Sequence, residues 1–250
     1  MTQPAGFNTI EQFRTPEGGV LLVDKPQKWT SFDVVKKVRG TLRVKKVGHA
    51  GTLDPLATGL LILCSGKMTK KIDAYQAQMK AYSGTMQLGA VTASYDADTP
   101  PESEKDISGI STDAILGEAA SFVGEIEQLP PMYSAVKVEG QRLYKLARKG
   151  KEIERKLRTV TVHRFTIDDV TLPAVDFTVE CSKGTYVRTL AHDLGQRLQC
   201  GAYLTALRRT AIGEHQVSDA WTIDQISERA ALLNAASSGK ESAGDRRQPS

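Results

Sequence analysis

Residues 48–61 read Gly-His-Ala-Gly-Thr-Leu-Asp-Pro-Leu-Ala-Thr-Gly-Leu-Leu and contain a single carboxylate, that of Asp54. Three glycines in this run permit backbone geometries and close approaches that other residues resist. Pro55 fixes its own φ and moves Asp54 out of the helical region. The run therefore predicts a shaped loop that presents one acid to a ligand, and a helix N-cap or an Asx-turn is the alternative interpretation.

Alternating and helical patterns extend on both sides of this loop. A strand is predicted over 19–23, stopped by Pro26, and a helix from Ser31 is closed by Gly40. The other predicted strands are 60–64, 80–88, 159–170 and 175–181, the predicted helices are 112–122, 187–198 and 223–233, and 202–209 is a short strand or turn. Residues 94–111 are predicted to form a loop. Strands and helices intermix without a regular βαβ rhythm, which indicates an α+β or mixed α/β fold.

Three segments are expected from the composition along the chain. Residues 1–17 are an N-terminal extension, and 18–233 form one catalytic domain. Residues 234–250, rich in Ala, Ser, Gly and charged residues, are expected to be a disordered tail.

Composition limits the class of protein. Hydrophobic residues make up 40% and charged residues 25% of the 250 residues, which fits a soluble globular protein. No apolar run is long enough for a membrane span, and the polar N-terminus lacks the layout of a signal peptide. The three cysteines form no Cys-x-x-Cys pair, so a disulfide framework or zinc site is not indicated, and a reducing cytoplasm is the expected location.

The charges are unevenly distributed. Residues 25–80 hold twelve Lys and Arg against three Asp, and 137–164 hold ten basic residues against three Glu. Basic surface attracts phosphate backbones, although runs of charge are also ordinary solvated faces.

Common catalytic motifs are absent from the sequence. It contains no phosphate-binding glycine loop, no Gly-x-Ser-x-Gly elbow and no metal-ligand spacing among its four histidines. These absences argue against the common kinase, dehydrogenase and hydrolase classes.

Three further stretches carry aromatic or basic residues: 128–135 (Gln-Leu-Pro-Pro-Met-Tyr-Ser-Ala), 181–195 and 207–209 (Leu-Arg-Arg). The second stretch is predicted to place Tyr186 and Arg188 at a strand-to-helix turn. Tyr82 lies in a predicted strand. Together they could form a pocket for a flipped base, in which an aromatic ring stacks on the nucleobase and arginines meet phosphate or carboxylate. Half-buried structural tyrosines and a solvated arginine are the alternative.

These motifs, in this order, resemble the pseudouridine synthases of the bacterial TruB type. The resemblance covers residues 18–229 and rests on Val-Asp-Lys-Pro with Thr-Ser, the 48–60 run, Lys-Ala-Tyr, Pro-Pro-Met-Tyr-Ser-Ala, Lys-Gly-Thr-Tyr-Val-Arg-Thr-Leu and Leu-Arg-Arg. It implies a pseudouridine synthase fold, with a mixed, mostly antiparallel central sheet flanked by helices and loops.

The resemblance also implies roles for matching residues. Asp54 corresponds to the essential aspartate, Tyr82 to the aromatic residue that stacks on the target base, and Arg188 to the ion-pair partner that keeps Asp54 ionised. The substrate-binding residues implied are His49, which fills the space left by the extruded base, Tyr186 beside Arg188, Leu207 as the apolar pocket wall, and Lys25 and Lys70 near the bound RNA.

The implied reaction isomerises the uridine at position 55 in the TΨC arm of tRNA. The N1–C1′ bond breaks, the uracil turns, and C5 joins C1′. No metal or cofactor is implied, because the base serves as leaving group and nucleophile. Asp54 attacks C1′ or removes a sugar proton to give a glycal, and both routes stay open. The expected partner is the TΨC stem-loop, with no membrane, and the chain is expected to act as a monomer.

Two departures from the family pattern stand out. Lys28 occupies a position where the family usually has glycine, which would strain the backbone if φ is positive there. The chain is also too short after residue 233 for the PUA-type domain that many members carry. Two other functions remain as alternatives: a tRNA-folding RNA-binding module with secondary catalysis, and an N-glycosidic hydrolase that uses one Asp.

Overall fold

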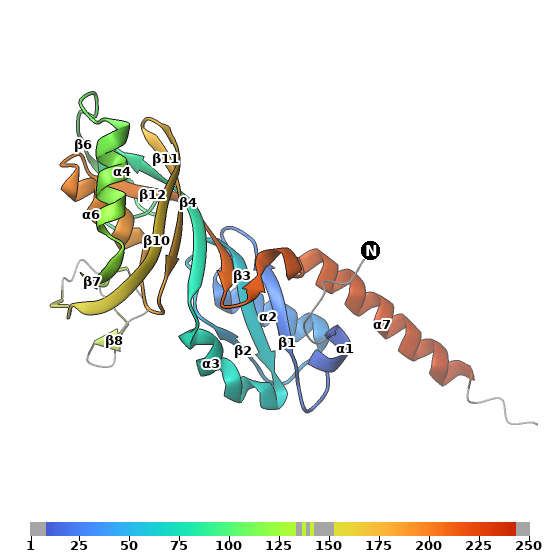
Figure 1. Ribbon diagram of the computed structural model, residues 1–250. Helices are drawn as coiled ribbons and strands as arrows, with labels where there is room; N and C mark the ends of the chain where they lie inside the picture. Colours follow the sequence, from blue (N-terminus) through green and yellow to red (C-terminus); the bar gives the residue numbers. More distant parts are fainter. Residues whose placement is uncertain (1–8, 134–136, 139–140, 143–152, 244–250) are drawn as a thin grey trace, which may run out of the picture. The chain divides into compact units, whose positions relative to one another are not determined.

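The computed structural model describes residues 9–133, 137–138, 141–142 and 153–243. The chain divides into two compact units (Figure 1). Unit 1 comprises residues 1–76 and 214–250, and unit 2 comprises residues 77–213. The motifs of the sequence analysis are therefore divided between two compact units, and the first and last parts of the chain belong to the same unit.

Unit 1 is built on three antiparallel strands. The strand β3 (Thr58–Ser65) pairs with both β1 (Val20–Lys25) and β2 (Val47–Ala50). Its other elements are α1 (Ile10–Phe13), α2 (Ser31–Leu42), η1 (Gly66–Lys71), α3 (Ile72–Ala77), β13 (His215–Gln216), η2 (Val217–Asp219) and α7 (Ile223–Ala243). The apolar stripe of α2 packs with α1, α7 and the strands into one hydrophobic core.

The helix α2 shows how local sequence sets its ends. Thr30 and Asp33 form a reciprocal capping box at its start, which satisfies two backbone N–H groups. The helix ends at Leu42 rather than at the predicted Gly40, and its C-cap Arg43 lies in the left-handed region with φ 55°. Nothing lies within 4 Å of the position of a Cβ at Gly40, so this glycine is an exposed helical residue.

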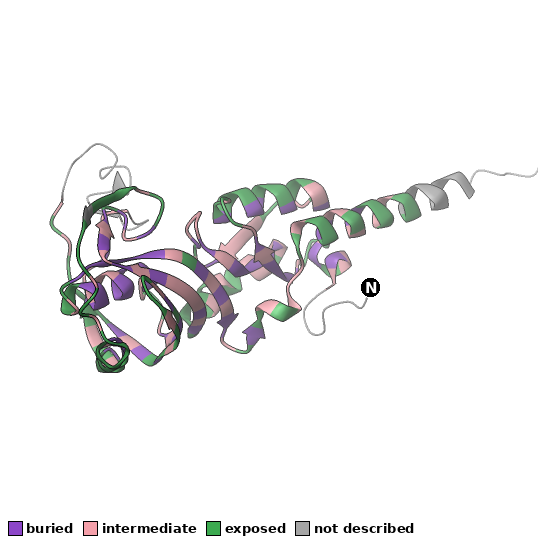
Figure 2. Cartoon of the chain, turned by 90° about the horizontal axis from the view of Figure 1, so that it is seen from above, coloured by how far each residue is buried: buried purple, intermediate pink, exposed green. Residues whose placement is uncertain are grey.

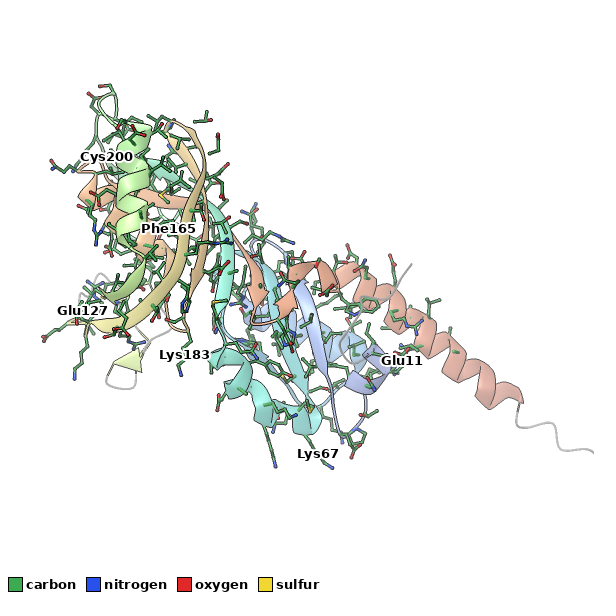
Figure 3. All side chains as sticks on the ribbon, viewed as in Figure 1. Glu11, Lys67, Glu127, Phe165, Lys183 and Cys200 are labelled. Atoms are coloured by element: carbon green, nitrogen blue, oxygen red, sulfur yellow. The ribbon has the colours of Figure 1, made fainter. Side chains whose placement is uncertain are left out.

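Both chain ends differ from the sequence expectation. Ile10 and Phe13 of α1 are buried in the core of unit 1, so residues 10–13 belong to that core. At the other end, α7 continues to Ala243, and a helix thus occupies 234–243 where composition predicted disorder. An ion pair between Glu11, which is labelled in Figure 3, and Arg229 joins α1 to α7.

Unit 2 contains an antiparallel sheet in the order β12-β4-β11-β10-β7. These strands are β4 (Lys80–Leu88), β7 (Gly124–Gln128), β10 (Arg158–Thr171), β11 (Ala174–Cys181) and β12 (Ala202–Ile212). Two small hairpins pair β5 (Ala90–Thr92) with β6 (Pro101–Glu104), and β8 (Lys137–Val138) with β9 (Gln141–Arg142).

Two helices cover this sheet. The helix α4 (Thr112–Ser121) packs against β10, and α6 (Val187–Arg197) packs against β12. Edge-to-face contacts join Phe122, Phe165 and Phe177 beneath them. Figure 2 shows the buried residues gathered on the strands and on the inner helix faces. The α+β architecture with an antiparallel sheet is confirmed.

Candidate active site

The Asp54 loop links β2 to β3 in unit 1. Gly51 and Gly59 bound it, with φ of 89° and 98°, which are left-handed conformations that glycine adopts without strain. Leu53 and Ala57 are buried and anchor the loop in the protein, whereas Asp54 between them is half-buried. The sequence prediction of a shaped loop that presents one carboxylate matches this geometry.

Residues before and at the start of α2 hold the loop by its backbone. The buried Ser31 hydroxyl accepts the Leu53 N–H at 2.8 Å and donates to the Leu53 carbonyl at 3.2 Å. The Lys28 N–H donates to the Pro55 carbonyl at 2.8 Å. Lys28 has φ 67°, so a residue with a side chain stands in the left-handed region here. The backbone on both sides of Asp54 is thus fixed from one neighbouring turn.

The other predicted residues of unit 1 differ in exposure. His49 lies half-buried on β2, and Lys70 is exposed on η1. Lys25 is fully buried at the end of β1, and its ammonium donates to the carbonyls of Pro26 at 3.0 Å and Trp29 at 2.6 Å. The structure therefore gives Lys25 a role in bracing the turn that carries Lys28.

In unit 2, Tyr82 and Leu207 lie on adjacent strands. Leu207 of β12 is opposite Gly84 of β4, two residues along the strand from Tyr82. Side chains of directly opposed residues lie on the same face of a sheet, and side chains two residues apart along one strand also share a face. Tyr82 and Leu207 therefore lie on the same, largely buried face of the sheet. At Gly84 a Cβ would come within 2.8 Å of Phe177, so the close packing of this face requires glycine.

Arg188 lies in the first turn of α6, and Tyr186 is its N-cap residue. The Arg188 side chain is 5% exposed, and its guanidinium donates to groups of the 94–96 segment and of Tyr133. Nη1 donates to the Ser94 carbonyl at 2.9 Å and to Asp96 Oδ2 at 3.1 Å, and Nη2 donates to the Tyr133 carbonyl at 2.8 Å. Burial of a guanidinium is tolerated where such partners replace water.

Asp96 is itself held in place. It is 0% exposed and accepts hydrogen bonds from the Ser94 hydroxyl and the Asp98 N–H. The ring of the preceding Tyr95 stacks on His192 of α6, with 3.8 Å between the ring centroids. These contacts join the 92–98 segment to the helix that carries Arg188.

The predicted site residues thus fall into two sets. Asp54, His49, Lys25 and Lys70 belong to unit 1, and Tyr82, Tyr186, Arg188 and Leu207 belong to unit 2. Within unit 2 the partner of Arg188 is Asp96, which sequence reasoning missed. The ion pair between Arg188 and Asp54 stays a prediction.

Comparisons with known proteins identify the family. Residues 39–187 match the model of the TruB family pseudouridylate synthase N-terminal domain, and residues 188–243 match that of the tRNA pseudouridylate synthase B C-terminal domain. The chain belongs to the TruB family. A tRNA pseudouridine synthase B of Chlorobium chlorochromatii is 50% identical over 229 residues, covering 90% of this chain and 89% of that protein. One of Opitutus terrae is 52% identical over 208 residues, covering 83% and 86%.

Solved structures agree with the TruB family assignment. A chain in the crystal structure of a Cbf5-Nop10-Gar1 complex superposes with a TM-score of 0.69 at 30% identity. The match covers 94% of this chain, which spans 62% of the length of that one. An H/ACA RNP bound to a substrate RNA, at 24% identity and a TM-score of 0.67, supports the fold. The predicted pseudouridine synthase fold and enzyme class are confirmed.

Other reactive groups in this TruB family member are unsuited to nucleophilic catalysis. All three cysteines are free and buried, and burial raises the pKa of the Cys64 and Cys181 thiols to about 11. The thiols of Cys64 and Cys181 are therefore protonated at neutral pH, whereas the thiolate is the nucleophile. Within the described ranges, no group of three or more His, Cys, Asp or Glu could hold a metal ion. No helix in that part of the chain is long and apolar enough to cross a bilayer.

Proposed function

We propose that this chain is a tRNA pseudouridine synthase that isomerises the uridine at position 55 in the TΨC arm. The observation that carries the proposal is 50% identity, across 90% of the chain, to a curated tRNA pseudouridine synthase B. The geometry of the Asp54 loop supports it, because a half-buried carboxylate on a rigid loop is available to a reacting sugar carbon.

In the proposed reaction Asp54 is the catalytic carboxylate. It either attacks C1′ or removes a sugar proton as the N1–C1′ bond breaks. The uracil then turns, C5 bonds to C1′, the C5 proton is lost and N1 gains a proton. The chain's own groups and the base supply each step of this route.

The remaining site residues bind and orient the flipped nucleotide. Tyr82 stacks on the uracil and is the candidate base for the C5 proton, and Leu207 forms the apolar wall. Arg188 pairs with Asp54 and keeps it ionised, with Tyr186 beside it. His49 occupies the space left in the RNA.

Basic side chains of unit 1 provide the proposed RNA surface. In residues 28–46, Asp33 is the one carboxylate among seven Lys and Arg. Most of these cations are exposed on α2 and the turn that follows, and Lys70 on η1 is also exposed, whereas the buried Lys25 would act through its turn. Neutralising phosphates releases counterions, which favours binding to tRNA. We further propose that the enzyme acts as a monomer in the cytoplasm, where its three free thiols remain reduced.

Substitution of Asp54 by Asn tests the proposal. With an unmodified tRNA transcript, the wild-type protein should convert the uridine at position 55, and mapping of the product identifies the site. Asp54→Asn should lower the rate by at least about 10⁴-fold, because the amide can neither attack C1′ nor accept a proton. Binding of the transcript should persist.

Two outcomes would favour the alternatives. Conversion by Asp54→Asn at the wild-type rate would remove Asp54 from the mechanism and favour a folding module with secondary catalysis. Free uracil as the product would indicate an N-glycosidic hydrolase instead.

A further inference from the structure

Gln128, at the end of β7, is a buried amide whose contacts go to another part of unit 2. Its side chain is 2% exposed. Nε2 donates to the Tyr186 carbonyl at 3.0 Å, and Oε1 accepts the Tyr186 N–H at 2.7 Å. In Figure 3 the labels Glu127 and Lys183 mark the two chain segments that this contact joins. The Gln128 side chain therefore hydrogen-bonds to both the N–H and the C=O of Tyr186, as the backbone of a neighbouring β-strand does for a paired residue.

That residue begins α6. Tyr186 is the N-cap but makes no side-chain capping hydrogen bond, and tyrosine is not among the residues that cap well. Its carbonyl accepts the Thr189 and Leu190 N–H groups at 3.1 and 3.2 Å, so it also starts the helical hydrogen bonds. The orientation of this backbone therefore sets the direction in which the first turn, with Arg188, leaves the loop.

The segment after Gln128 makes a second contact with the same turn. The Tyr133 carbonyl accepts from Arg188 Nη2 at 2.8 Å. Between the two contacts, the Pro130 carbonyl accepts from Arg155 Nη1 at 3.0 Å. Gln128 itself is paired with Arg158 of β10, so its backbone belongs to the sheet. Residues 128–133 thus link a rigid strand to the helix start at two points.

We propose that Gln128 is a positioning residue for the isomerisation: its amide fixes the Tyr186 backbone and thereby places the Tyr186 ring and the Arg188 guanidinium toward the flipped nucleotide. The inference rests on the proposed function of Tyr186 and Arg188. Gln128 does not touch the substrate. Its effect on the reaction passes through the geometry of the first turn of α6.

The chemistry of the contact allows a specific test. Glutamate at this position keeps the shape, but its ionised form only accepts hydrogen bonds and would face the Tyr186 carbonyl without a donor. The protonated acid has one O–H donor and one carbonyl acceptor, and so reproduces both contacts of the amide. Gln128→Glu should therefore fail at alkaline pH and recover at acidic pH.

The experiment measures single-turnover isomerisation with enzyme in excess over an unmodified tRNA transcript labelled with tritium at C5 of uridine. Relative to wild type, Gln128→Glu should be slower by about 10²-fold at about pH 8, since small misplacements of catalytic groups cost that much. The ratio of the variant rate to the wild-type rate should be at least about 10-fold higher at about pH 5.5 than at about pH 8, because the buried acid is protonated at the lower pH. The dissociation constant for tRNA should change less than about 3-fold, because contacts outside the first turn remain.

Two further variants complete the design. Gln196→Glu makes the same charge change at an exposed position of α6 and should show neither the loss nor the recovery. Gln128→Met keeps the length without either hydrogen bond, so its loss should not depend on pH. Near-UV circular dichroism identifies the conditions in which each variant is folded.

Two results would overturn the inference: folded Gln128→Met at the wild-type rate, whatever Gln128→Glu shows, or a loss in Gln196→Glu equal to that in Gln128→Glu. A wild-type protein that makes no pseudouridine would instead overturn the proposed function. The two failures are therefore distinguishable.

Discussion

The Asp54 loop of unit 1 and the Arg188 turn of unit 2 differ in how their functional side chain is held. The loop is fixed through its backbone, by the Ser31 hydroxyl on Leu53 and the Lys28 N–H on Pro55, and it leaves Asp54 half-buried. In the turn the functional side chain is itself fixed and buried. Arg188 is 5% exposed and its guanidinium contacts a carboxylate and two carbonyls.

The difference fits the roles proposed for the two groups. A carboxylate that reacts with a sugar carbon needs an open approach, so its loop is best held from behind by backbone hydrogen bonds. A guanidinium that orients other groups needs a fixed direction, and several acceptors provide it. Burial of that cation is costly without partners, so the turn depends on each of them.

The largest expected effect comes from the contact between Asp96 and Arg188. Asp96→Ala removes the buried carboxylate that pairs with the Arg188 guanidinium, and removing one partner of a buried ion pair costs about 3–5 kcal/mol in the free energy of unfolding. Because Arg188 also loses its direction, isomerisation of tRNA should fall by about 10²-fold. Urea unfolding and single-turnover kinetics measure the two effects.

Asp98→Ala is the matched control, since Asp98 is exposed two residues away. Its free energy of unfolding should lie within about 0.5 kcal/mol of the wild-type value. An Asp96→Ala protein that is as stable and active as the Asp98→Ala protein would show that Arg188 does not depend on a buried carboxylate.

The same contrast explains what the sequence could predict. The Asp54 loop is determined by neighbouring glycines and a proline, so its shape is visible in one short run. The partner of Arg188 is 92 residues away in sequence, within a polar segment predicted as a loop, and nothing local distinguishes Asp96 from Asp98. Gln128 belongs to the stretch 128–135, but the sequence contains no sign that its side-chain amide hydrogen-bonds to the Tyr186 backbone.

Secondary structure shows a similar limit. The prediction of β4 over 80–88 agrees with the structure, whereas 202–209 was predicted as a short strand or turn and belongs to the eleven-residue β12. This strand has two register shifts against β4, which interrupt the alternation of buried and exposed residues. Predictions from alternation fail where a bulge changes which face a side chain occupies.

The second largest effect is expected where Ser31 holds the backbone of the Asp54 loop. Ser31→Ala removes the hydroxyl that meets both the N–H and the carbonyl of Leu53, so buried backbone groups lose their partner. The free energy of unfolding should fall by about 1–3 kcal/mol. Single-turnover isomerisation should slow while the dissociation constant for tRNA is unchanged, because Asp54 is displaced but the basic surface is intact.

Ser227→Ala provides the comparison, because its hydroxyl donates to the Ile223 carbonyl one turn earlier in α7 of unit 1. It should alter neither the rate nor the stability measurably. If Ser31→Ala proved as active as this control, the loop would have to be held by its glycines and buried anchors rather than by the backbone contacts.

The smallest expected effect comes from Lys28, which has a positive φ beside the Asp54 loop. With φ 67°, a side chain at this position is strained by about 1–2 kcal/mol relative to glycine. Lys28→Gly relieves that strain, but glycine also gains freedom in the unfolded chain, so the net gain in the free energy of unfolding should be under about 1 kcal/mol. Chemical denaturation measures it. The backbone N–H to Pro55 is retained in the variant, so the rate of isomerisation should stay at the wild-type value.

Arg43→Gly makes a matched change, since Arg43 has φ 55° at the end of α2 and the same charge is lost. A similar small gain is expected there, because glycine is favoured where a helix ends in the left-handed conformation. If Lys28→Gly lowered stability while Arg43→Gly raised it, the Lys28 side chain would contribute more than its backbone strain costs. The Asp54 loop would then be held by a side chain as well, and the contrast with the Arg188 turn would be weaker than the hydrogen bonds indicate.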